Sequence, residues 1–380
     1  MKNDAGTLFN PRFGLRPDLF LGRSEAVETI LSAQDSTNSP YRTTFITGLR
    51  GSGKTSLLSD IAIEFQKKKE LVVSVSEMDD LLAAVIDQLL QKSRNIGRKI
   101  TGISASALGF SFGVSLSSDA QSQSFRGAIG KILMALKNQG ISPIILIDEV
   151  SGETKALKEF ASTYQLMARE GLDMLVVAAG LPKAVSRVAN ERALTFLQKA
   201  GRIKLGPLPM DEILDTYLKV FSKSDPGVTY ELVKMLAGQT YGFPYLYQLI
   251  GYYVTELSGG KIDGDVAAKA LARSKELLFE NVLSLLLRDT TEKERDFLFA
   301  MLRVSNENAT GAIPGRLDGT TVPEVRFGDI ANRMGVTKSY AVKYRQRLLD
   351  AMLIEKAGYG KLRFAPPLFS EYLSLEMDNY

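Results

Sequence analysis

The residues best suited to chemistry form one continuous stretch, Gly48 to Thr55, with the sequence GLRGSGKT. It matches the pattern G-x-x-x-x-G-K-[ST], in which glycines let successive backbone N–H groups point at one anion. In that pattern Lys54 reaches the β- and γ-phosphates of a nucleotide, and Thr55 offers its hydroxyl to Mg²⁺. The residues predicted to bind ATP or ADP here are Gly48, Leu49, Arg50, Gly51, Ser52, Gly53, Lys54, Thr55 and Ser56.

Two adjacent carboxylates supply the second half of such a site. Asp148 and Glu149 directly follow the four apolar residues Ile144–Ile147. A buried strand over those four residues places Asp148 at its carboxyl end, where open α/β sheets bind their ligands. Asp148 would then hold Mg²⁺ through water, and Glu149 would orient or deprotonate the attacking water. The predicted catalytic residues are Lys54, Asp148 and Glu149, and the predicted metal-binding residues are Thr55 and Asp148.

These residues need a framework that places them, and the pattern of apolar residues predicts one. The predicted strands, which are short, apolar and rich in β-branched residues, are 43–47, 71–75, 144–147, 174–178 and 202–205. The predicted helices between them are 55–68, 79–94, 122–138, 154–170 and 183–199. Strands that alternate with helices predict an α/β fold with a parallel sheet. The first strand would run directly into the glycine-rich stretch, and a helix would leave it.

The rest of the chain has a different character. Beyond Gly206–Pro209 the strand signal stops, and residues 210–288 are predicted to be helices separated by Gly and Pro. Further on, Phe327–Val336 predicts a short helix closed by a glycine turn, and Thr337 caps a second helix. This is a helix-turn-helix pattern. The hairpin predicted over residues 353–364 would form a wing beside it.

Positive charge gathers in this last module. Residues 326–363 hold nine basic and three acidic residues, a net charge of +6, whereas the whole chain has +4. Basic residues that neutralise phosphates are the main source of affinity for DNA. The residues predicted to contact double-stranded DNA are Lys338, Lys343, Arg347, Lys361 and Arg363. The alternative is a winged helix that contacts protein, with its basic residues only solvated.

Composition excludes several kinds of chemistry. The 380 residues include no His, no Cys and no Trp. Zinc or other His/Cys-bound metal sites, thiol nucleophiles and Ser-His-Asp triads are therefore excluded. The N-terminus lacks the apolar region of a signal peptide, and no run of about 18 apolar residues occurs. We therefore expect a cytoplasmic protein with no membrane partner.

The motifs together resemble the AAA+ superfamily of P-loop ATPases, in which an adjacent Asp-Glu pair is typical. Residues 20–25, FLGRSE, are similar to the F-x-G-R box of origin-recognition initiators and of the related STAND signalling ATPases. That resemblance implies that Arg23 lies near the adenine and ribose. Residues 239–244, QTYGFP, look like the G-x-P element in the helical lid of the same branch, which implies that Pro244 approaches the base.

Two departures from the family bear on the rate of hydrolysis. The fourth strand ends in Ala178-Ala179-Gly180, where many AAA+ enzymes carry a polar sensor residue, and no arginine closely follows Pro244. Both departures predict slow hydrolysis without weakening the prediction of nucleotide binding. The family also implies a trans-acting arginine finger, for which Arg192 is the first candidate and Arg187 and Arg202 are rivals. Such a finger requires a homo-oligomer.

The predicted domains are a nucleotide-binding AAA+ α/β domain at 1–206, a helical lid domain at 207–288 and a winged-helix domain at 289–380. The expected function is that of an ATP-binding ATPase whose nucleotide state controls DNA binding or assembly through the winged helix. The alternative is a STAND-like signalling or scaffold ATPase whose winged helix contacts protein. Residues 98–118 alternate apolar residues with Ser or Gly, which predicts an inserted hairpin that touches DNA or a neighbouring subunit, or serves as a structural flap.

Overall fold

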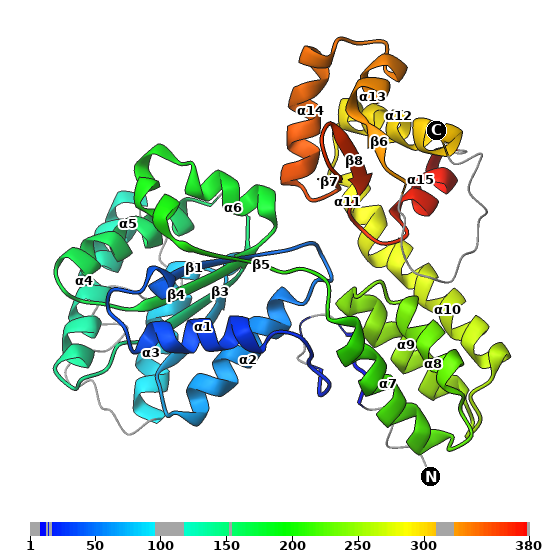
Figure 1. Cartoon of the computed structure of the whole chain (residues 1–380). Coiled ribbons are helices and arrows are strands. Elements are labelled where there is room, and N and C mark those ends of the chain that lie inside the picture. The colour runs from blue at the N-terminus through cyan, green and yellow to red at the C-terminus, as the bar shows by residue number, and fades with distance from the viewer. Residues whose placement is uncertain are drawn as a thin grey trace. The chain divides into compact units, whose positions relative to one another are not determined.

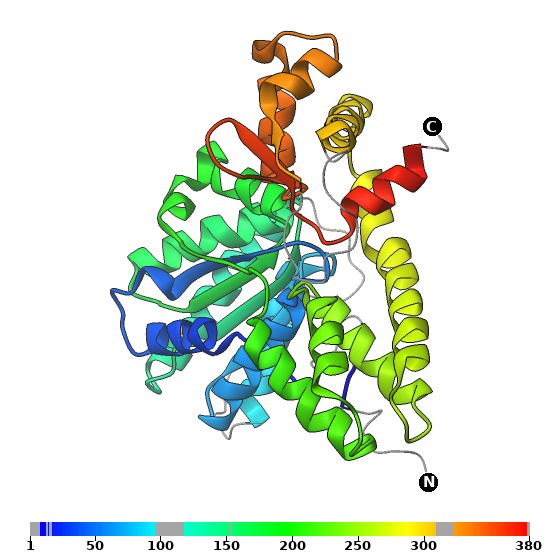
Figure 2. The ribbon, with the colours of Figure 1, turned by 45° about the vertical axis from the view of Figure 1, so that its right-hand side comes forward.

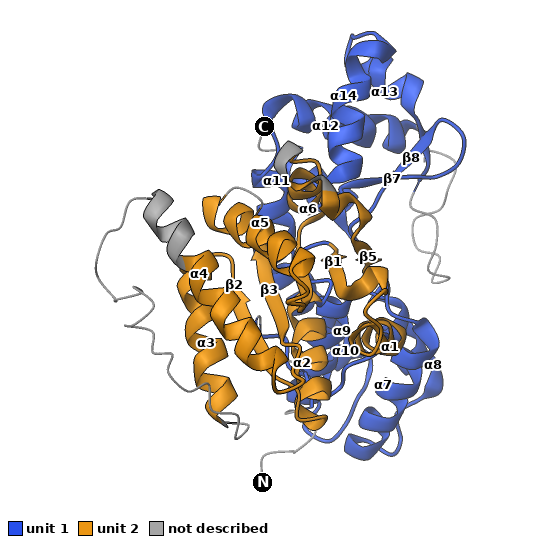
Figure 3. Ribbon diagram, turned by 90° about the vertical axis from the view of Figure 1, so that its left-hand side faces the viewer, with its two compact units in different colours: residues 1–22, 49–53, 206–380 blue, residues 23–48, 54–205 orange. Residues whose placement is uncertain are grey.

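The computed structural model describes residues 8–12, 14, 17–95, 118–151, 154–308 and 323–377. These divide into two compact units, coloured separately in Figure 3. Unit 1 comprises residues 1–22, 49–53 and 206–380, and unit 2 comprises residues 23–48 and 54–205. The boundaries at 206 and 288 expected from the sequence stay predictions. Apart from Ser118, the segment 98–118 lies outside the described residues.

Unit 2 is built on the predicted parallel sheet (Figure 1). The strands are β1 (Thr43–Thr47), β2 (Val72–Ser76), β3 (Ile144–Val150), β4 (Leu175–Gly180) and β5 (Gly201–Lys204). Their order across the sheet is β2-β3-β4-β1-β5, and every neighbouring pair is parallel. This order confirms the α/β fold class. It also places β1 inside the sheet, between β4 and the edge strand β5, with the glycine-rich stretch directly after it.

Helices cover both faces of this sheet. One face carries α1 (Ser24–Gln34) and α2 (Lys54–Lys67). The other face carries α3 (Leu81–Asn95), α4 (Ser118–Lys137), α5 (Lys155–Arg169), α6 (Pro182–Ala189) and the 3-10 helix η4 (Arg192–Lys199). A short 3-10 turn, η2 (Pro40–Arg42), precedes β1. Because β1, β3 and β4 are covered on both sides, most of their residues are apolar without alternation, whereas the edge strand β5 (GRIK) has exposed basic residues.

The single helix expected over 183–199 is wrong. The structure breaks it at Asn190 and Glu191, and Glu191 has extended backbone angles, φ −64° and ψ 127°. Asn190 caps α6 with its backbone amide, which donates to the carbonyl of Ser186 at 3.1 Å, and its side-chain amide also donates to the hydroxyl of Ser186 at 3.2 Å. Asn favours helix ends over helix interiors, so the helix stops here although the apolar periodicity continues.

Unit 1 contains the predicted helical region and an N-terminal segment anchored in it. The helices are α7 (Met210–Ser224), α8 (Tyr230–Gly238), α9 (Pro244–Leu257) and α10 (Gly264–Leu278). The ring of Phe9 lies 5.6 Å from the rings of both Tyr217 and Tyr247. A Cβ at Gly251 would come within 2.5 Å of the Phe9 ring, so α9 accepts this ring only because Gly251 has no side chain.

The C-terminal module is a winged helix, as expected. Figure 2 shows α10, the π-helical turn η5 (Phe279–Leu283) and α11 (Ser284–Arg288) as one continuous helical run leading toward it. Its elements are α12 (Glu292–Asn308), β6 (Val325–Arg326), α13 (Phe327–Arg333), α14 (Lys338–Asp350), β7 (Ile354–Lys356), β8 (Lys361–Phe364) and α15 (Phe369–Met377). The three strands form a small antiparallel sheet in the order β6-β8-β7. Across the described ranges of the whole chain, no helix is long and apolar enough to cross a membrane.

Candidate nucleotide site and candidate nucleic-acid interface

The glycine-rich stretch has the backbone that its sequence requires. Gly51 and Gly53 have φ values of +81° and +86°, in the left-handed region that side chains disfavour. Between them, the amide of Ser52 donates to the carbonyl of Leu49 at 3.1 Å and closes a tight turn. The 14-residue helix α2 begins directly after the turn, at Lys54. The strand–turn–helix order of this motif places the positive end of a helix dipole at the turn.

Two polar groups in this stretch suit a phosphate. The hydroxyl of Ser52 is buried, and it has no hydrogen-bond partner among the residues that the structure describes. A buried donor of this kind costs free energy unless a ligand or water satisfies it. The ammonium of Lys54 reaches back to the carbonyl of Gly48 at 3.0 Å, so its positive charge stays at the turn. The residues present therefore fit a nucleoside triphosphate.

Residues of unit 1 pack tightly on the glycines of the turn. A Cβ on Gly51 would lie 3.1 Å from the ring of Phe243 and 3.2 Å from Cβ of Tyr245. A Cβ on Gly53 would lie 3.9 Å from Cβ of Pro244, the first residue of α9. The turn and the start of α9 are thus in contact. The contact of Phe243 and Tyr245 with the turn could not be inferred from the motif, which indicated only Pro244.

The sequence predicts that the paired carboxylates follow a strand over residues 144–147. In the structure they lie within it, because β3 continues to Val150. The register between β3 and β4 shifts between Ile147 and Val150, which marks a β-bulge over Asp148 and Glu149. Glu149 has φ +57°, an unfavourable value for a residue with a side chain. Its amide donates to Oδ1 of Asp148 at 2.8 Å. The hydroxyl of Ser76, at the end of β2, donates to Oε2 of Glu149 at 3.1 Å.

This bulge explains the missing polar sensor at the end of β4. Gly180 is paired with Val150, and a Cβ on Gly180 would lie 2.6 Å from the carbonyl oxygen of Val150. Real Cβ atoms do not approach a backbone oxygen so closely. A polar side chain at Gly180 is therefore sterically excluded, and that information lies in the pairing of β3 with β4 rather than in the sequence motif.

The predicted arginines occupy different places. Arg23 is buried at the start of α1. The guanidinium of Arg202 lies 5.9 Å from the centre of the Phe45 ring, and Arg187 is in the last turn of α6. Arg192 is the first residue of η4, and its side chain is not among those that the structure describes. The assignment of an arginine finger stays a prediction.

The basic residues of the winged helix are exposed, and most of them already have a partner. Lys361 pairs with Glu324 at 2.9 Å, and Arg363 pairs with Glu355 at 2.5 Å. Both pairs are about 40–45% exposed, so they are weakly held. The two wing residues predicted to contact DNA are therefore placed on the surface, but each is partly neutralised within the module.

The three predicted residues of α14 point in different directions. The ammonium of Lys343 lies 4.5 and 4.8 Å from the ring centres of Tyr340 and Tyr344. The end of the Lys338 side chain lies over Gly328 of α13. Arg347 instead lies on the side of α14 that faces α12, where its guanidinium is 3.8 Å from the nearly buried carboxylate of Glu294. Lys338 and Lys343 are thus better placed than Arg347 for an external partner.

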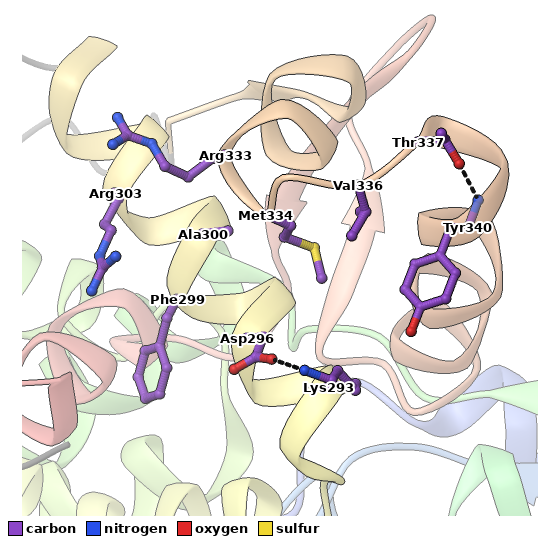
Figure 4. Close-up of a pocket in the computed structure, with 10 residues that line it drawn as sticks. All are labelled: Lys293, Asp296, Phe299, Ala300, Arg303, Arg333, Met334, Val336, Thr337 and Tyr340. Carbon is purple, nitrogen blue, oxygen red and sulfur yellow. Dashed lines mark hydrogen bonds and ion pairs between the residues drawn. The ribbon is translucent and has the colours of Figure 1, made fainter.

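A groove of about 520 Å³ lies between α12 and the turn into α14 (Figure 4). Phe299, Met334 and Val336 supply its apolar lining, and Arg303 and the ion pair of Lys293 with Asp296 supply charge. It lies on the side of α14 that faces α12, and the ammonium of Lys343 lies over the ring of Tyr340, which lines the groove, so Lys343 borders it. No motif in the sequence indicated it.

Comparison with known proteins supports the chemistry of the glycine-rich turn. Residues 20–179 match a family described as an ATPase domain predominantly from Archaea. Residues 280–373 match a domain of unknown function, DUF8462. No sequence among curated proteins matches the chain.

Two solved structures share the fold over nearly all of this chain. A Walker-type ATPase of Pyrococcus abyssi is 14% identical, with a TM-score of 0.67, over 97% of this chain and 99% of that one. The ORC2 protein of Aeropyrum pernix in its ADPNP–ADP complexes is 13% identical, with a TM-score of 0.64, over 98% of each chain. At these identities the likeness concerns the fold alone, which includes the small antiparallel sheet of a winged helix.

Proposed function

We propose that this chain, whose residues 20–179 match a family of archaeal ATPase domains, binds ATP with Mg²⁺ at Gly48–Thr55 and hydrolyses it slowly. The observation that carries the proposal is the turn itself, where left-handed glycines, the unpartnered Ser52 hydroxyl and the Lys54 ammonium precede a helix. The backbone amides and Lys54 would hold the phosphates. Mg²⁺ would neutralise charge that develops on them, and Thr55 and Asp148 would hold it.

Hydrolysis would depend on the carboxylates of β3. Glu149 would take the proton of the attacking water, and Ser76 fixes the direction of its carboxylate. Gly180 offers no side chain to assist, in agreement with a slow rate. The family resemblance further suggests that Arg23 and Pro244 lie beside the nucleoside and that any arginine finger, such as Arg192, comes from a second copy.

A titration with fluorescent ATP tests the core of this proposal. Lys54→Ala should weaken ATP binding by about 100-fold, since it removes the only charge that the motif directs at the phosphates. The matched control is Lys67→Ala, which removes the same charge from the exposed last turn of the same helix. Unchanged ATP affinity in Lys54→Ala would refute nucleotide binding at this turn.

We further propose that the nucleotide state controls DNA binding by the winged helix. Within unit 1 a continuous series of contacts begins at the glycine-rich turn, where Gly51 packs on Tyr245. The hydroxyl of Tyr245 accepts a hydrogen bond at 3.2 Å from the amide of Asn281, in the π-helical turn η5. π-Helical turns are frequent at functional sites because they strain the regular ladder.

The same turn contacts the winged helix. Phe279, also in η5, meets Tyr372 of α15 edge to face, with 5.3 Å between ring centres. Lys275, in the last turn of α10, forms an ion pair with Glu371 of α15. A change at the phosphate-binding turn would therefore be transmitted through Tyr245 and η5 to the module that carries the basic residues.

Double-stranded DNA is the proposed partner of this module because its net charge is positive and Lys338 and Lys343 are exposed without a carboxylate partner among the described residues. The double variant Lys338→Glu with Lys343→Glu should bind a duplex at least about tenfold more weakly than the wild type at low salt. The control is Lys219→Glu with Lys223→Glu, which changes charge equally at two exposed residues of α7, outside the winged helix. Fluorescence anisotropy with a labelled duplex measures both.

The groove favours the second candidate function, a signalling or scaffold ATPase whose winged helix contacts protein. Its apolar lining and charged rim are typical of a surface that binds a protein segment. Under this alternative the wild type would bind no duplex even at low salt, and neither double variant would change that result.

A further inference from the structure

Glu77 is an acidic residue in an unusual position. It follows β2 directly, and only 2% of its surface is exposed. Its side chain accepts hydrogen bonds from the Ser151 amide at 2.6 Å, the Ser151 hydroxyl at 2.9 Å and the Thr154 hydroxyl at 2.6 Å. A longer one, at 3.4 Å, comes from the Thr154 amide. Acidic side chains are almost never buried unless all their acceptor capacity is used in this way.

These bonds hold the chain on both sides of Glu149. Before Glu149, the backbone amide of Glu77 donates to the carbonyl of Asp148 at 3.0 Å. After Glu149, its carboxylate holds Ser151 and also Thr154, whose hydroxyl caps α5 by accepting from the Leu157 amide. One residue therefore fixes the end of β3 to the end of β2 and to the start of α5.

The segment that it fixes is strained. Glu149 has φ +57° inside the bulge of β3. A left-handed backbone at a residue with a side chain costs free energy and persists only when its surroundings impose it. Ser76 contacts the carboxylate of Glu149, but it does not hold the backbone that follows. Glu77 holds it through Ser151 and Thr154, beyond the point where Val150 pairs with Gly180 of β4.

We infer that Glu77 is a positioning residue that holds Glu149 in the conformation from which its carboxylate meets the attacking water. This inference rests on the proposed ATP hydrolysis. Glu77 acts through the backbone and takes no part in the reaction, because its oxygens are already engaged by Ser151 and Thr154. Its loss should therefore reduce turnover while leaving ATP binding, which depends on Lys54 and the glycine-rich turn, nearly unchanged.

The test compares Glu77→Ala and Glu77→Gln with the wild type, and uses Asp173→Asn as a matched control. Asp173 is also an acidic residue of unit 2, and it forms an ion pair at 2.7 Å with the buried Arg42, next to the opposite, amino-terminal end of β4. Three quantities are measured: kcat, the dissociation constant for ATP, and hydrogen exchange of the Ser151 amide in nucleotide-free protein.

Glu77→Ala should lower kcat at least tenfold, change the ATP dissociation constant less than threefold and speed exchange at Ser151 at least tenfold. Glu77→Gln keeps one acceptor oxygen, so its kcat and exchange should lie between those of Glu77→Ala and the wild type, and it serves if Glu77→Ala does not fold. Asp173→Asn should leave all three quantities near their wild-type values.

Normal kcat or unchanged Ser151 exchange in both Glu77 variants would overturn the inference. Equal losses of kcat in Asp173→Asn would also overturn it, since they would show a general loss of stability. Absence of ATP turnover in the wild type would instead refute the proposed hydrolysis itself, so the two failures are distinguishable.

Discussion

The carboxylates of β3 and the basic residues of the winged helix are both charged and both functional candidates, yet they are held in opposite ways. The side chain of Glu149 is exposed, but its backbone is held by the buried Glu77 and by the bulge that packs against Gly180, and Ser76 donates to its carboxylate. Lys361 and Arg363 are fixed only by exposed ion pairs with carboxylates of their own module.

The difference lies in free energy. A buried polar group that loses its partner costs about 1–3 kcal/mol, whereas an exposed ion pair contributes about 0–1 kcal/mol. The end of β3 should therefore respond strongly to single substitutions. The winged helix should tolerate substitutions, and its affinity for a charged partner should come from the sum of many weak contacts.

The largest effect is expected at Glu149. Glu149→Gly should lower ATP turnover by about 100-fold or more, the usual contribution of a general base. It should also raise the free energy of unfolding by about 1 kcal/mol, because glycine adopts φ +57° without strain. Turnover assays and urea denaturation measure the two effects. A less stable Glu149→Gly variant would show that the backbone at this position is not strained.

A side chain at Gly180 would disrupt the packing of β4 against the bulge of β3. Gly180→Ala should lower the free energy of unfolding by about 2–3 kcal/mol, because its Cβ would meet the Val150 carbonyl. Gly127→Ala, in α4, is the control: a Cβ there meets nothing within 4 Å, so it should stabilise the protein by about 0.5 kcal/mol. Equal stabilities of the two variants would contradict the packing of Gly180 against the bulge.

The smallest effect on stability is expected in the wing. Lys361→Ala with Arg363→Ala should change the free energy of unfolding by less than about 1 kcal/mol. It should also make the slope of log K against log salt for DNA binding shallower, by an amount that corresponds to about two phosphate contacts. Glu324→Ala with Glu355→Ala breaks the same pairs but keeps the basic charges, so it should strengthen DNA binding. Weaker binding in that second variant would mean that the carboxylates position the basic residues rather than neutralise them.

The sequence was sufficient where a structural element depends on residues close together in the chain. The glycine-rich turn, β3 with its two carboxylates and the winged helix all carry local patterns of glycine, apolar and capping residues. The role of Glu77 could not be predicted, because its partners Ser151 and Thr154 are 74 and 77 residues away in the chain and only the fold buries it. The sequence showed that the end of β4 lacks a polar sensor residue, but it could not show why Gly180 is required there, because that depends on the register of β3 against β4.

The sequence predicted the net charge of the winged helix well, but it did not predict which way its basic side chains point or which carboxylates they pair with. Counting residues located the basic module, but it could not show that Arg347 faces Glu294 of α12 or that Lys361 and Arg363 each have a carboxylate partner. These pairings join residues on different elements, so they depend on how helices and strands pack. The anchoring of Phe9 beside Gly251 was missed for the same reason.

The most direct test of the whole account is the affinity for a DNA duplex in two nucleotide states. With a non-hydrolysable ATP analogue and with ADP, the dissociation constants of the wild type should differ at least about fivefold at the same salt concentration. Asn281→Ala removes the hydrogen bond to Tyr245, so it should reduce that difference to less than about twofold. Equal dissociation constants in both states, or no duplex binding at low salt, would contradict the account.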